Sequence, residues 1–586
     1  TKMMMMLAAA TLTVACSSDN DWYDDWTQNP TNGNGATTGS GATATGSGEL
    51  TTFTIAIDKT TAEPETTMEE FFPDEEDDLA NNSFGTDVAI AFNGNTATCQ
   101  AADGVTIATD GAHVVCDHGS TKGVRYTVSG TTTNGSLTIV GEKKYEVVLN
   151  GADITNPDST ALNLLSKKRA YVVLADGTNN RLADGAQTKS TDQKAAFYCK
   201  GKLLFNGSGA LEVYGNYNNG IHSADYIVFR KGNNIYVSST AGHGIKANDG
   251  IYINGGILNV EVSATAAKGI NCENSIVVNG GRTTVITTGD STYDTDDKET
   301  KGAAGIKADS TYTQNGGQVQ LKSTGKGGKG LRADWEAYLN GGKLLVITEG
   351  SQYQYSGDTT SPKGIKVGTK NVHGVLQMNG TDIMVRTKGS GGEGIESKGT
   401  LTIGGGSVQV SAYDDAINSA SNMTISDGTV VAVSTNNDGL DANGNMYLKG
   451  GTVVAFGTGG AETGIDTGEQ YKLYITGGNI FGIGGRIDTQ LGSTTQGIAT
   501  TSGSVTAGST VSVKDSTGTL TTFTMPPYSY SNGTIVVSTP AMVAGSSYTL
   551  TLAGTEQTIS ATNTLQSSMG GMGGTQPIPP MLLCRV

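Results

Sequence analysis

The sequence predicts an all-β protein in which coils stack into a parallel β-helix, a type of solenoid. An Ile or Leu is followed nine residues later by paired glycines or by Asn-Gly-Gly, as in Ile245 with Asn254 and Ile270 with Asn279. These Ile and Leu residues, here called anchors, recur every 22 to 25 residues except where extra residues are inserted. A fixed period in this range, with short alternating segments in every unit, indicates stacked strands rather than helices.

Alternation along a strand assigns the faces of each unit. If an anchor points inward, the second residue after it also points inward. These inward positions are mostly small: Ser223, Ala247, Cys272, Ala308, Ala333, Val367, Ser397, Ser419, Ala442 and Thr467. The residue between them must point outward, and we call this column the outer ladder: His222, Lys246, Asn271, Lys307, Arg332, Lys366, Glu396, Asn418, Asp441 and Asp466. Its first half is basic and its second half acidic, so any site should be sought there first.

The chain divides into six parts by composition. We expect a lipoprotein signal at 1–16, a flexible tether at 17–50, an N-terminal cap at 51–122, the parallel β-helix at 123–486, a small antiparallel β module at 487–566 and a disordered tail at 567–586. The cap would shield the open edge of the first coil. The module is expected because strand-like runs continue after the repeat stops.

Charge and the N-terminus predict an exported protein. The chain has 38 basic and 55 acidic residues, and the net charge of −17 argues against a nucleic-acid partner. An apolar run at 3–10 precedes Thr13-Val14-Ala15-Cys16, which is typical of a bacterial lipoprotein signal. We therefore expect a monomer at the outer membrane or cell surface, attached to the membrane only through a lipid on Cys16. The alternative is an ordinary signal peptide with a coincidental cysteine.

The remaining cysteines carry less information. Cys199 and Cys272 fall on inward positions three coils apart, so they are expected to be small core residues. Cys99 and Cys116 could pair in an oxidising envelope.

Carboxylates gather in the acidic half and predict a calcium site. Aligning the coils on their anchors stacks three columns: Glu393, Asp415 and Asp438; Asp414, Asn437 and Glu462; and Glu396, Asn418, Asp441 and Asp466. Carboxylates held about 4.8 Å apart repel one another unless a cation lies between them, and oxygen ligands without His or Cys favour Ca²⁺. The alternative is a solvated acidic face.

Insertions and basic residues predict a sugar-binding rim. Residues 289–304 and 350–363, with a smaller insertion at 389–393, share one corner of the coil, and such a shared corner is often the binding rim. The first insertion carries Asp294, Asp296 and Asp297, a further cation candidate whose alternative is a mobile loop. The candidate ligand-binding residues could receive sugar carboxylates or stack on sugar rings: Lys246, Lys307, Arg332, Lys366, Trp335, Tyr353 and Tyr355. A basic ladder that only pairs with neighbouring acids is the alternative.

Familiar catalytic motifs are missing. The five histidines are scattered, and there is no His-Glu-x-x-His motif, Gly-x-Ser-x-Gly elbow or Walker loop. Elimination by a lysine base on a Ca²⁺-bridged uronate is the one enzyme class with its ingredients present, and Lys366 beside Glu393 and Glu396 is where they meet.

Three passages carry a resemblance to a known family: residues 126–151, residues 167–178, and residues 437–457 with Asn437-Asp438-Gly439-Leu440-Asp441-Ala442-Asn443-Gly444. Over residues 120–490 the chain resembles bacterial carbohydrate-binding-domain proteins with a pectate-lyase-like, right-handed β-helix. The resemblance implies calcium sites and binding of cellulose or polygalacturonate, without established turnover. The leading hypothesis is therefore a calcium-dependent polysaccharide-binding lipoprotein, with a lyase and a structural adhesin as alternatives.

Overall fold

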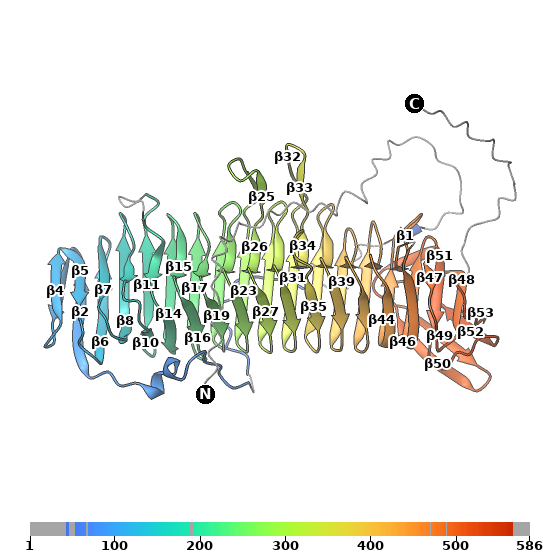
Figure 1. Ribbon diagram of the computed structural model, residues 1–586, viewed down its shortest axis with the longest axis horizontal. Helices are drawn as coiled ribbons and strands as arrows, with labels where there is room; N and C mark the ends of the chain where they lie inside the picture. Colours follow the sequence, from blue (N-terminus) through green and yellow to red (C-terminus); the bar gives the residue numbers. More distant parts are fainter. Residues whose placement is uncertain are drawn as a thin grey trace, which may run out of the picture.

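The computed structural model describes residues 43–45, 53–65, 68–187, 192–468, 470–487 and 489–565. The predicted all-β class is confirmed, because the regular elements of these residues are strands apart from the 3-10 turns η2 (Glu75–Asp77) and η3 (Leu79–Asn81). Short parallel strands follow one another along a single long axis (Figure 1). Within the described ranges there is no apolar helix of membrane-spanning length.

One strand from each repeat enters a 15-stranded sheet, and this sheet carries the anchors. Ile245 pairs with Ile270, and Ile306 pairs with Leu331, in parallel register. The strands, in order, are β4 (Thr106–Asp110), β5 (Ala112–Asp117), β7 (Gly135–Val140), β9 (Leu162–Leu164), β12 (Ala195–Cys199), β15 (Asn219–Ser223), β18 (Ile245–Ala247), β21 (Lys268–Cys272), β26 (Ala304–Ala308), β29 (Lys329–Ala333), β34 (Lys363–Val367), β37 (Glu393–Ser397), β40 (Ile417–Ser419), β43 (Leu440–Ala442) and β45 (Ile465–Asp466).

The other two strands of each repeat form two further parallel columns. The second column holds β10 (Ala170–Leu174), β13 (Leu203–Gly207), β16 (Tyr226–Phe229), β19 (Gly250–Ile253), β22 (Ser275–Val278), β27 (Thr311–Gln314), β30 (Glu336–Leu339), β35 (Val375–Met378), β38 (Thr400–Ile403) and β41 (Met423–Ile425). The third holds β11 (Asn179–Asp184), β14 (Ala210–Gly215), β17 (Asn234–Ser239), β20 (Ile257–Val262), β23 (Arg282–Thr287), β28 (Gln318–Ser323), β31 (Lys343–Thr348), β36 (Asp382–Thr387), β39 (Ser407–Ala412) and β42 (Thr429–Ser434). Both join one 30-stranded sheet through the long strands β8 (Tyr145–Asn156), β44 (Met446–Phe456) and β46 (Lys472–Gly484).

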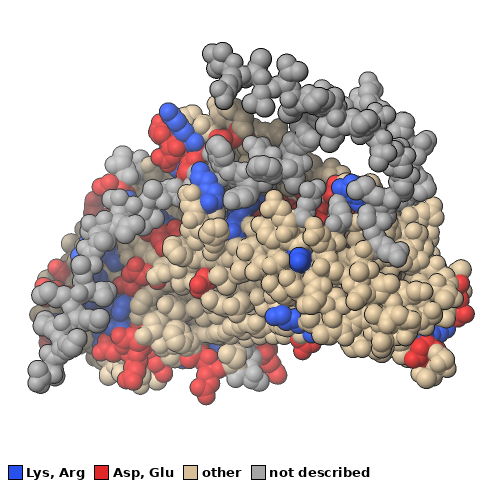
Figure 2. Space-filling view, turned by 45° about the vertical axis from the view of Figure 1, so that its right-hand side comes forward, with Lys and Arg blue, Asp and Glu red and all other residues tan. Residues whose placement is uncertain are grey.

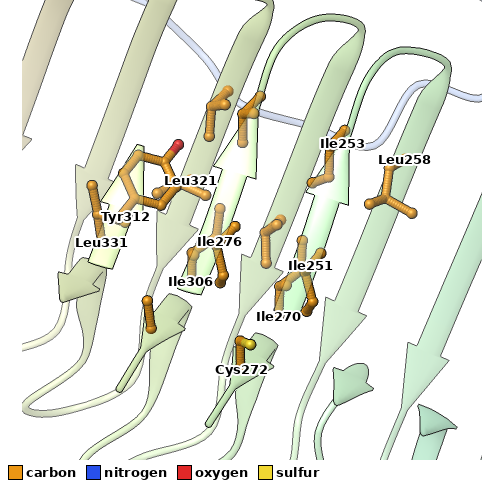
Figure 3. Close-up of a cluster of buried hydrophobic side chains, with 14 of the residues drawn as sticks. Ile251, Ile253, Leu258, Ile270, Cys272, Ile276, Ile306, Tyr312, Leu321 and Leu331 are labelled. Carbon is orange, nitrogen blue, oxygen red and sulfur yellow. The ribbon is translucent and has the colours of Figure 1, made fainter. Parts of the chain in front are cut away.

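The core lies between the columns and is apolar along its whole length. Figure 3 shows the anchors Ile270, Ile306 and Leu331 beside Ile251 and Ile276 of the second column. The predicted inward residues Cys199 and Cys272 are buried there, as expected. Because identical positions stack from coil to coil, each apolar layer continues into the next.

The glycine that precedes most anchors is a packing requirement of this core. A Cβ built on Gly364 would lie 2.2 Å from Val385 Cγ1, and one built on Gly330 would lie 2.2 Å from Val346 Cγ1. A side chain at either of these two glycines would therefore collide with the third column, although Ala416 is accommodated before the anchor Ile417, and simple strand alternation is broken just before the anchor.

The residues predicted as an N-terminal cap have two arrangements. The hairpins β2 (Thr86–Asn93) with β3 (Thr96–Gln100), and β4 with β5, stand at the N-terminal end of the stack and continue into β6 (Val124–Thr132) and β7. Residues 53–65 and 68–82 instead run along the side of the stack, and we call them the strap. The Phe53 carbonyl accepts a bond from Arg386 Nη2 at 3.4 Å, whereas Asp77 binds Arg169 and Tyr226. The strap therefore bridges repeats that are far apart in the sequence.

Antiparallel strands close the C-terminal end, where an antiparallel module was expected. After β47 (Gln490–Leu491), strands β48 (Ile498–Val505) and β51 (Ser529–Ser538) pair antiparallel with each other, and β51 also pairs with β46. A four-stranded sheet follows from β49 (Thr510–Asp515), β50 (Gly518–Thr524), β52 (Ser547–Leu552) and β53 (Thr555–Ser560). A separate core, which includes Phe481 and Phe523, joins this sheet to the stack.

Several sequence expectations concern other parts of the chain. Cys16, the tether up to residue 42 and the tail at 567–586 lie outside the described residues. Cys99 and Cys116 are free thiols, so the open question of a disulfide between them is answered in the negative. On the face drawn in Figure 2, uncharged side chains cover the middle of the molecule and acidic ones gather along its lower edge.

Candidate functional site

The outer ladder exists in the predicted register. His222 pairs with Lys246, Lys307 with Arg332, Lys366 with Glu396, and Asp441 with Asp466, so residues from many repeats form one column on the 15-stranded sheet. The change of sign occurs between β34 and β37.

The ladder is far less exposed than its outward position suggested. Arg332 and Lys366 are 3% and 1% exposed, whereas Lys246 remains partly accessible. Its basic residues contact acids: Lys246 lies 2.7 Å from Glu273, Lys307 lies 2.7 Å from Asp309, and Arg332 lies 2.6 Å from Asp334. Much of the basic charge is therefore balanced within the sheet, which agrees with the alternative of a paired ladder.

A second outward column lies beside the ladder; its acidic half was predicted from the sequence, but its basic half was missed. Because the glycine before each anchor faces the core, the residue before that glycine faces outward. In the basic half these residues are Lys268, Lys329 and Lys363, and in the acidic half the same column continues through Glu393, Asp415 and Asp438. The recurring triplet of a charged residue, Gly and anchor would have revealed them, had the break in alternation been recognised.

Lys268 lies in the basic half of this column. Its backbone N–H donates to His243 Nδ1 at 3.0 Å, so that imidazole nitrogen acts as an acceptor. Its Nζ donates to the Ala266 carbonyl at 2.9 Å. Burial, followed by the charge of Lys307, lowers the pKa of Lys268 to about 7. Burial and nearby lysines also hold the pKa of His243 well below its usual range.

The two columns change sign together, which brings buried charges into contact. Lys363 Nζ lies 2.6 Å from Glu393 Oε1 and 3.4 Å from Glu396 Oε1, and Lys398 Nζ lies 2.5 Å from Glu396 Oε1. Lys366, the candidate base of a lyase, lies 4.0 Å from Glu396 Oε2. The predicted meeting of a lysine and carboxylates is therefore present, with Lys363 in closer contact than Lys366.

The acidic half brings three predicted aspartates together. Asn418 Nδ2 donates to Asp415 Oδ2 at 3.0 Å and to Asp441 Oδ2 at 2.8 Å, and the Asp438 N–H donates to Asp415 Oδ1 at 3.1 Å. Burial, and then repulsion from neighbouring carboxylates, raises the pKa of Asp415, Asp438 and Asp441 well above the usual range. Carboxyl groups are therefore crowded here, and burial disfavours their charged forms.

The other acidic column has the same character. Asn437 Nδ2 donates to Asp414 Oδ1 at 2.8 Å, and burial raises the pKa of Glu462, with Asp466 adding to the rise. The donors are all oxygen and suit a hard cation, which would relieve the repulsion. Yet among the described residues no three His, Cys, Asp or Glu side chains are grouped closely enough to hold a metal ion.

Two hairpins project from one rim of the sheet, as the insertions predicted. They are β24 (Thr292–Asp294) with β25 (Glu299–Lys301), and β32 (Tyr353–Tyr355) with β33 (Asp358–Thr360) (Figure 1). The rings of Tyr293 and Tyr355 stack with centroids 4.8 Å apart, and the Tyr293 N–H donates to the Tyr353 hydroxyl at 3.2 Å. The hairpins therefore form one aromatic unit.

The aspartates of the first hairpin are already occupied. Lys301 Nζ lies 2.6 Å from Asp294 Oδ2 and 2.5 Å from Asp297 Oδ2, and Asp294 Oδ1 accepts the N–H groups of Asp296 and Asp297. This arrangement is a lysine-neutralised turn, so it does not favour the cation site considered for these three residues.

Trp335 lies at the opposite edge of the sheet. It follows β29, whereas the hairpins precede β26 and β34, and its side chain is 57% exposed. The aromatic candidates therefore stand on both sides of the charged columns, and they are more accessible than the charges between them.

A family model described as "Carbohydrate-binding domain-containing protein" matches residues 110–276, 260–348 and 324–434. These overlapping matches cover more than half of the chain. The chain belongs to this carbohydrate-binding family. The region matched includes the basic columns, the hairpins, Trp335 and the beginning of the acidic half.

One relative and one solved structure are similar to parts of this chain. A carbohydrate-binding domain-containing protein from Acetivibrio thermocellus is 32% identical over 120 residues, which cover 19% of this chain and 42% of that relative. The match therefore spans less than half of the relative's length. A structure described as the polysaccharide lyase-like protein from C. thermocellum, in a gadolinium derivative, is 21% identical with a TM-score of 0.33, covering 50% of this chain and 96% of the other.

Proposed function

We propose that this protein binds an acidic polysaccharide across the outer face of the 15-stranded sheet, and that its coils wind as a right-handed parallel β-helix. The observation that carries the proposal is family membership across residues 110–434, the region that contains the basic columns and both aromatic rims. Right-handed winding is what parallel strands joined by crossovers adopt almost without exception.

The chemistry of the face favours an anionic glycan of the pectin type over an uncharged one such as cellulose. Lys307, Arg332 and Lys366 occupy three successive coils of one column, and Lys246 lies two coils before Lys307, so a polymer with a carboxylate on each sugar would meet several cations along the column. Trp335 and Tyr355 offer exposed aromatic surface on which sugar rings stack. The paired acids would move aside or exchange partners when the ligand carboxylates arrive.

Calcium is proposed for the acidic half. Asp415, Asp438 and Asp441, with Asp466 next in the ladder, would have to draw closer together around the ion. Burial, and then repulsion between neighbouring carboxylates, raises the pKa of the first three, and a cation would favour their charged forms. A bound cation would lower this repulsion and could also bridge to uronate groups. We further propose that the protein is an exported lipoprotein anchored through Cys16.

Binding should be measured on a glycan array and then by calorimetry with polygalacturonate and with cellulose oligomers, each with and without Ca²⁺. We expect Trp335→Ala to weaken polygalacturonate binding about tenfold, the loss of roughly one stacking contact. Tyr471→Ala is the matched control, because Tyr471 is 40% exposed but lies towards the C-terminal end of the stack. An array without any bound glycan would rule out the proposal and favour a structural adhesin.

An absorbance assay on the same protein distinguishes binding from turnover. A lyase would release unsaturated product absorbing in the ultraviolet from polygalacturonate with Ca²⁺, and Lys366→Ala would abolish that product. We expect binding without a change in absorbance.

A further inference from the structure

Lys268 differs from its neighbour Lys246 of the outer ladder in its contacts. The Lys268 Nζ donates to the Ala266 carbonyl at 2.9 Å, and no carboxylate oxygen within the described ranges lies at ion-pair distance from it. By contrast, Lys246 Nζ lies 2.7 Å from Glu273 Oε1. Both lysine side chains are half-buried. Lys268 is therefore accessible from solvent, but no acid holds its charge.

The backbone beside Lys268 is strained. Ala266 has a φ of 57°, in the left-handed region that residues with a Cβ rarely adopt. A glycine occupies the equivalent place two coils further on: Gly327 has a φ of 68°, and its carbonyl accepts a hydrogen bond from Lys329 Nζ at 3.0 Å. Outliers of this kind gather at functional sites. The contact between the Ala266 carbonyl and the Lys268 amine is therefore kept at a cost to the backbone.

The surroundings of Lys268 favour a neutral amine. Burial, and then the charge of Lys307, lowers the pKa of Lys268 to about 7. Asp309 and Asp334 act in the opposite direction, and Lys329 adds to the lowering. Both aspartates are held by Lys307, at 2.7 and 3.5 Å. A lysine that is desolvated beside another cation is an activated nucleophile, and its hydrogen bond to a carbonyl does not use the nitrogen lone pair.

The next position in the column of Lys268 is small. Lys268 pairs with Ala304, and Ala304 pairs in turn with Lys329, so a single methyl group separates the two lysines along the column. The hairpin of β24 and β25 leads directly into β26, the strand of Ala304, which places Tyr293 at the rim of that coil (Figure 1). Lys307 belongs to the same strand. A carboxylated sugar that approaches the amine from this side would therefore meet an aromatic rim and a cation.

We propose that Lys268 captures the open-chain aldehyde of an acidic reducing sugar as an imine. The Nζ lone pair attacks the aldehyde carbon, and one N–H proton passes to the oxygen to give a carbinolamine. The hydroxyl group then leaves as water with the second N–H proton, so a C=N bond replaces the C=O bond without any oxidant or reductant. The acidity of the sugar rests on the proposed function, whereas the covalent step requires no polymer. The protein would thereby hold the reducing end of a uronate chain.

Reductive trapping on the full chain tests the capture. The protein is incubated near neutral pH with D-galacturonate and cyanoborohydride, which reduces an imine to a stable secondary amine, and the modified lysines are located by peptide mass spectrometry. Lys246 is the internal control, because it is equally half-buried but is paired with Glu273. We expect Lys268 to be modified at least about tenfold faster than Lys246, since an ordinary lysine is almost entirely protonated at this pH.

A second sugar tests the preference for an acid. D-Galactose has the same aldehyde without the carboxylate, and we expect it to modify Lys268 about fivefold more slowly relative to Lys246, the factor that one solvated charge pair supplies. Lys268→Met should lose the adduct while Lys246 keeps its own slow modification.

The outcomes separate the inference from the proposed function. Equal modification of Lys268 and Lys246 overturns the capture, and equal rates with the two sugars overturn the preference for an acid. Capture of galacturonate by a protein that binds no glycan on the array would leave the inference standing and remove the proposed function. Binding of polygalacturonate without any adduct at Lys268 would do the reverse.

Discussion

Lys363 and Glu393 occupy equivalent positions on adjacent parallel strands, with Nζ and Oε1 2.6 Å apart and both side chains nearly inaccessible to water. This contact marks the coil at which the outward columns change from basic to acidic. The basic and acidic halves of the outward columns therefore meet at this buried ion pair.

Removing the cation of this pair should destabilise the protein. Lys363→Met leaves Glu393 without its closest cation, and breaking a buried ion pair from one side costs about 3–5 kcal/mol. Denaturant unfolding should show this loss. The double variant Lys363→Met, Glu393→Leu should recover most of it, and a double variant as unstable as the single one would contradict the ion-pair explanation.

Calcium should raise the melting temperature, and the aspartates should determine the size of the effect. An ion at one hundred times its dissociation constant stabilises the native state by about 2.7 kcal/mol. EDTA should therefore lower the melting temperature measured by calorimetry by about 3 °C. Asp438→Asn should raise the stability of the metal-free protein, because repulsion falls, and should abolish the response to Ca²⁺. A melting curve insensitive to both metal and EDTA would exclude the site.

Stability should rise with pH between about 7 and 10 through Lys268. Burial lowers its folded pKa to about 7, well below the ordinary lysine pKa of about 10.4, so the unfolded chain binds a proton in this window that the folded chain does not. The contribution of Lys268 to the free energy of unfolding is therefore most favourable above its pKa in the unfolded chain. This contribution is lost as the pH falls through its pKa in the folded protein. With allowance for its partial exposure we expect about 2 kcal/mol. Lys268→Met should flatten the unfolding free energy over this range, and an identical slope in both proteins would disprove the assignment.

Gly364, which precedes the anchor Ile365, should not tolerate a side chain. Gly364→Ala would place a Cβ 2.2 Å from Val385 Cγ1, and overpacking of this kind costs about 1–3 kcal/mol. Gly85→Ala is the control, because nothing lies within 4 Å of its Cβ position. Adding Val385→Ala to Gly364→Ala should restore part of the stability if the clash is the cause.

The repeat made the stack predictable, whereas local packing limited the prediction of the site. The spacing of the anchors was enough to predict that Ile245 stacks on Ile270 and that Lys366 lies beside Glu396. Once the anchors are aligned, the pairing of all the residues around them follows. The spacing did not reveal Lys363, since Gly364 interrupts alternation and only a three-dimensional core shows why. The contacts of Asp77 with Arg169 and Tyr226 were equally hidden, because no periodicity links the strap to the coils that it crosses.

The strap has a consequence for how the chain acquires its shape. A stack of similar repeats can fold one repeat after another as the chain leaves the ribosome. Here Phe53 is synthesised early, but its partner Arg386 emerges hundreds of residues later. The strap is made before the coils that it crosses but is among the last segments to settle, so final assembly is a long-range event even though the coils themselves are local.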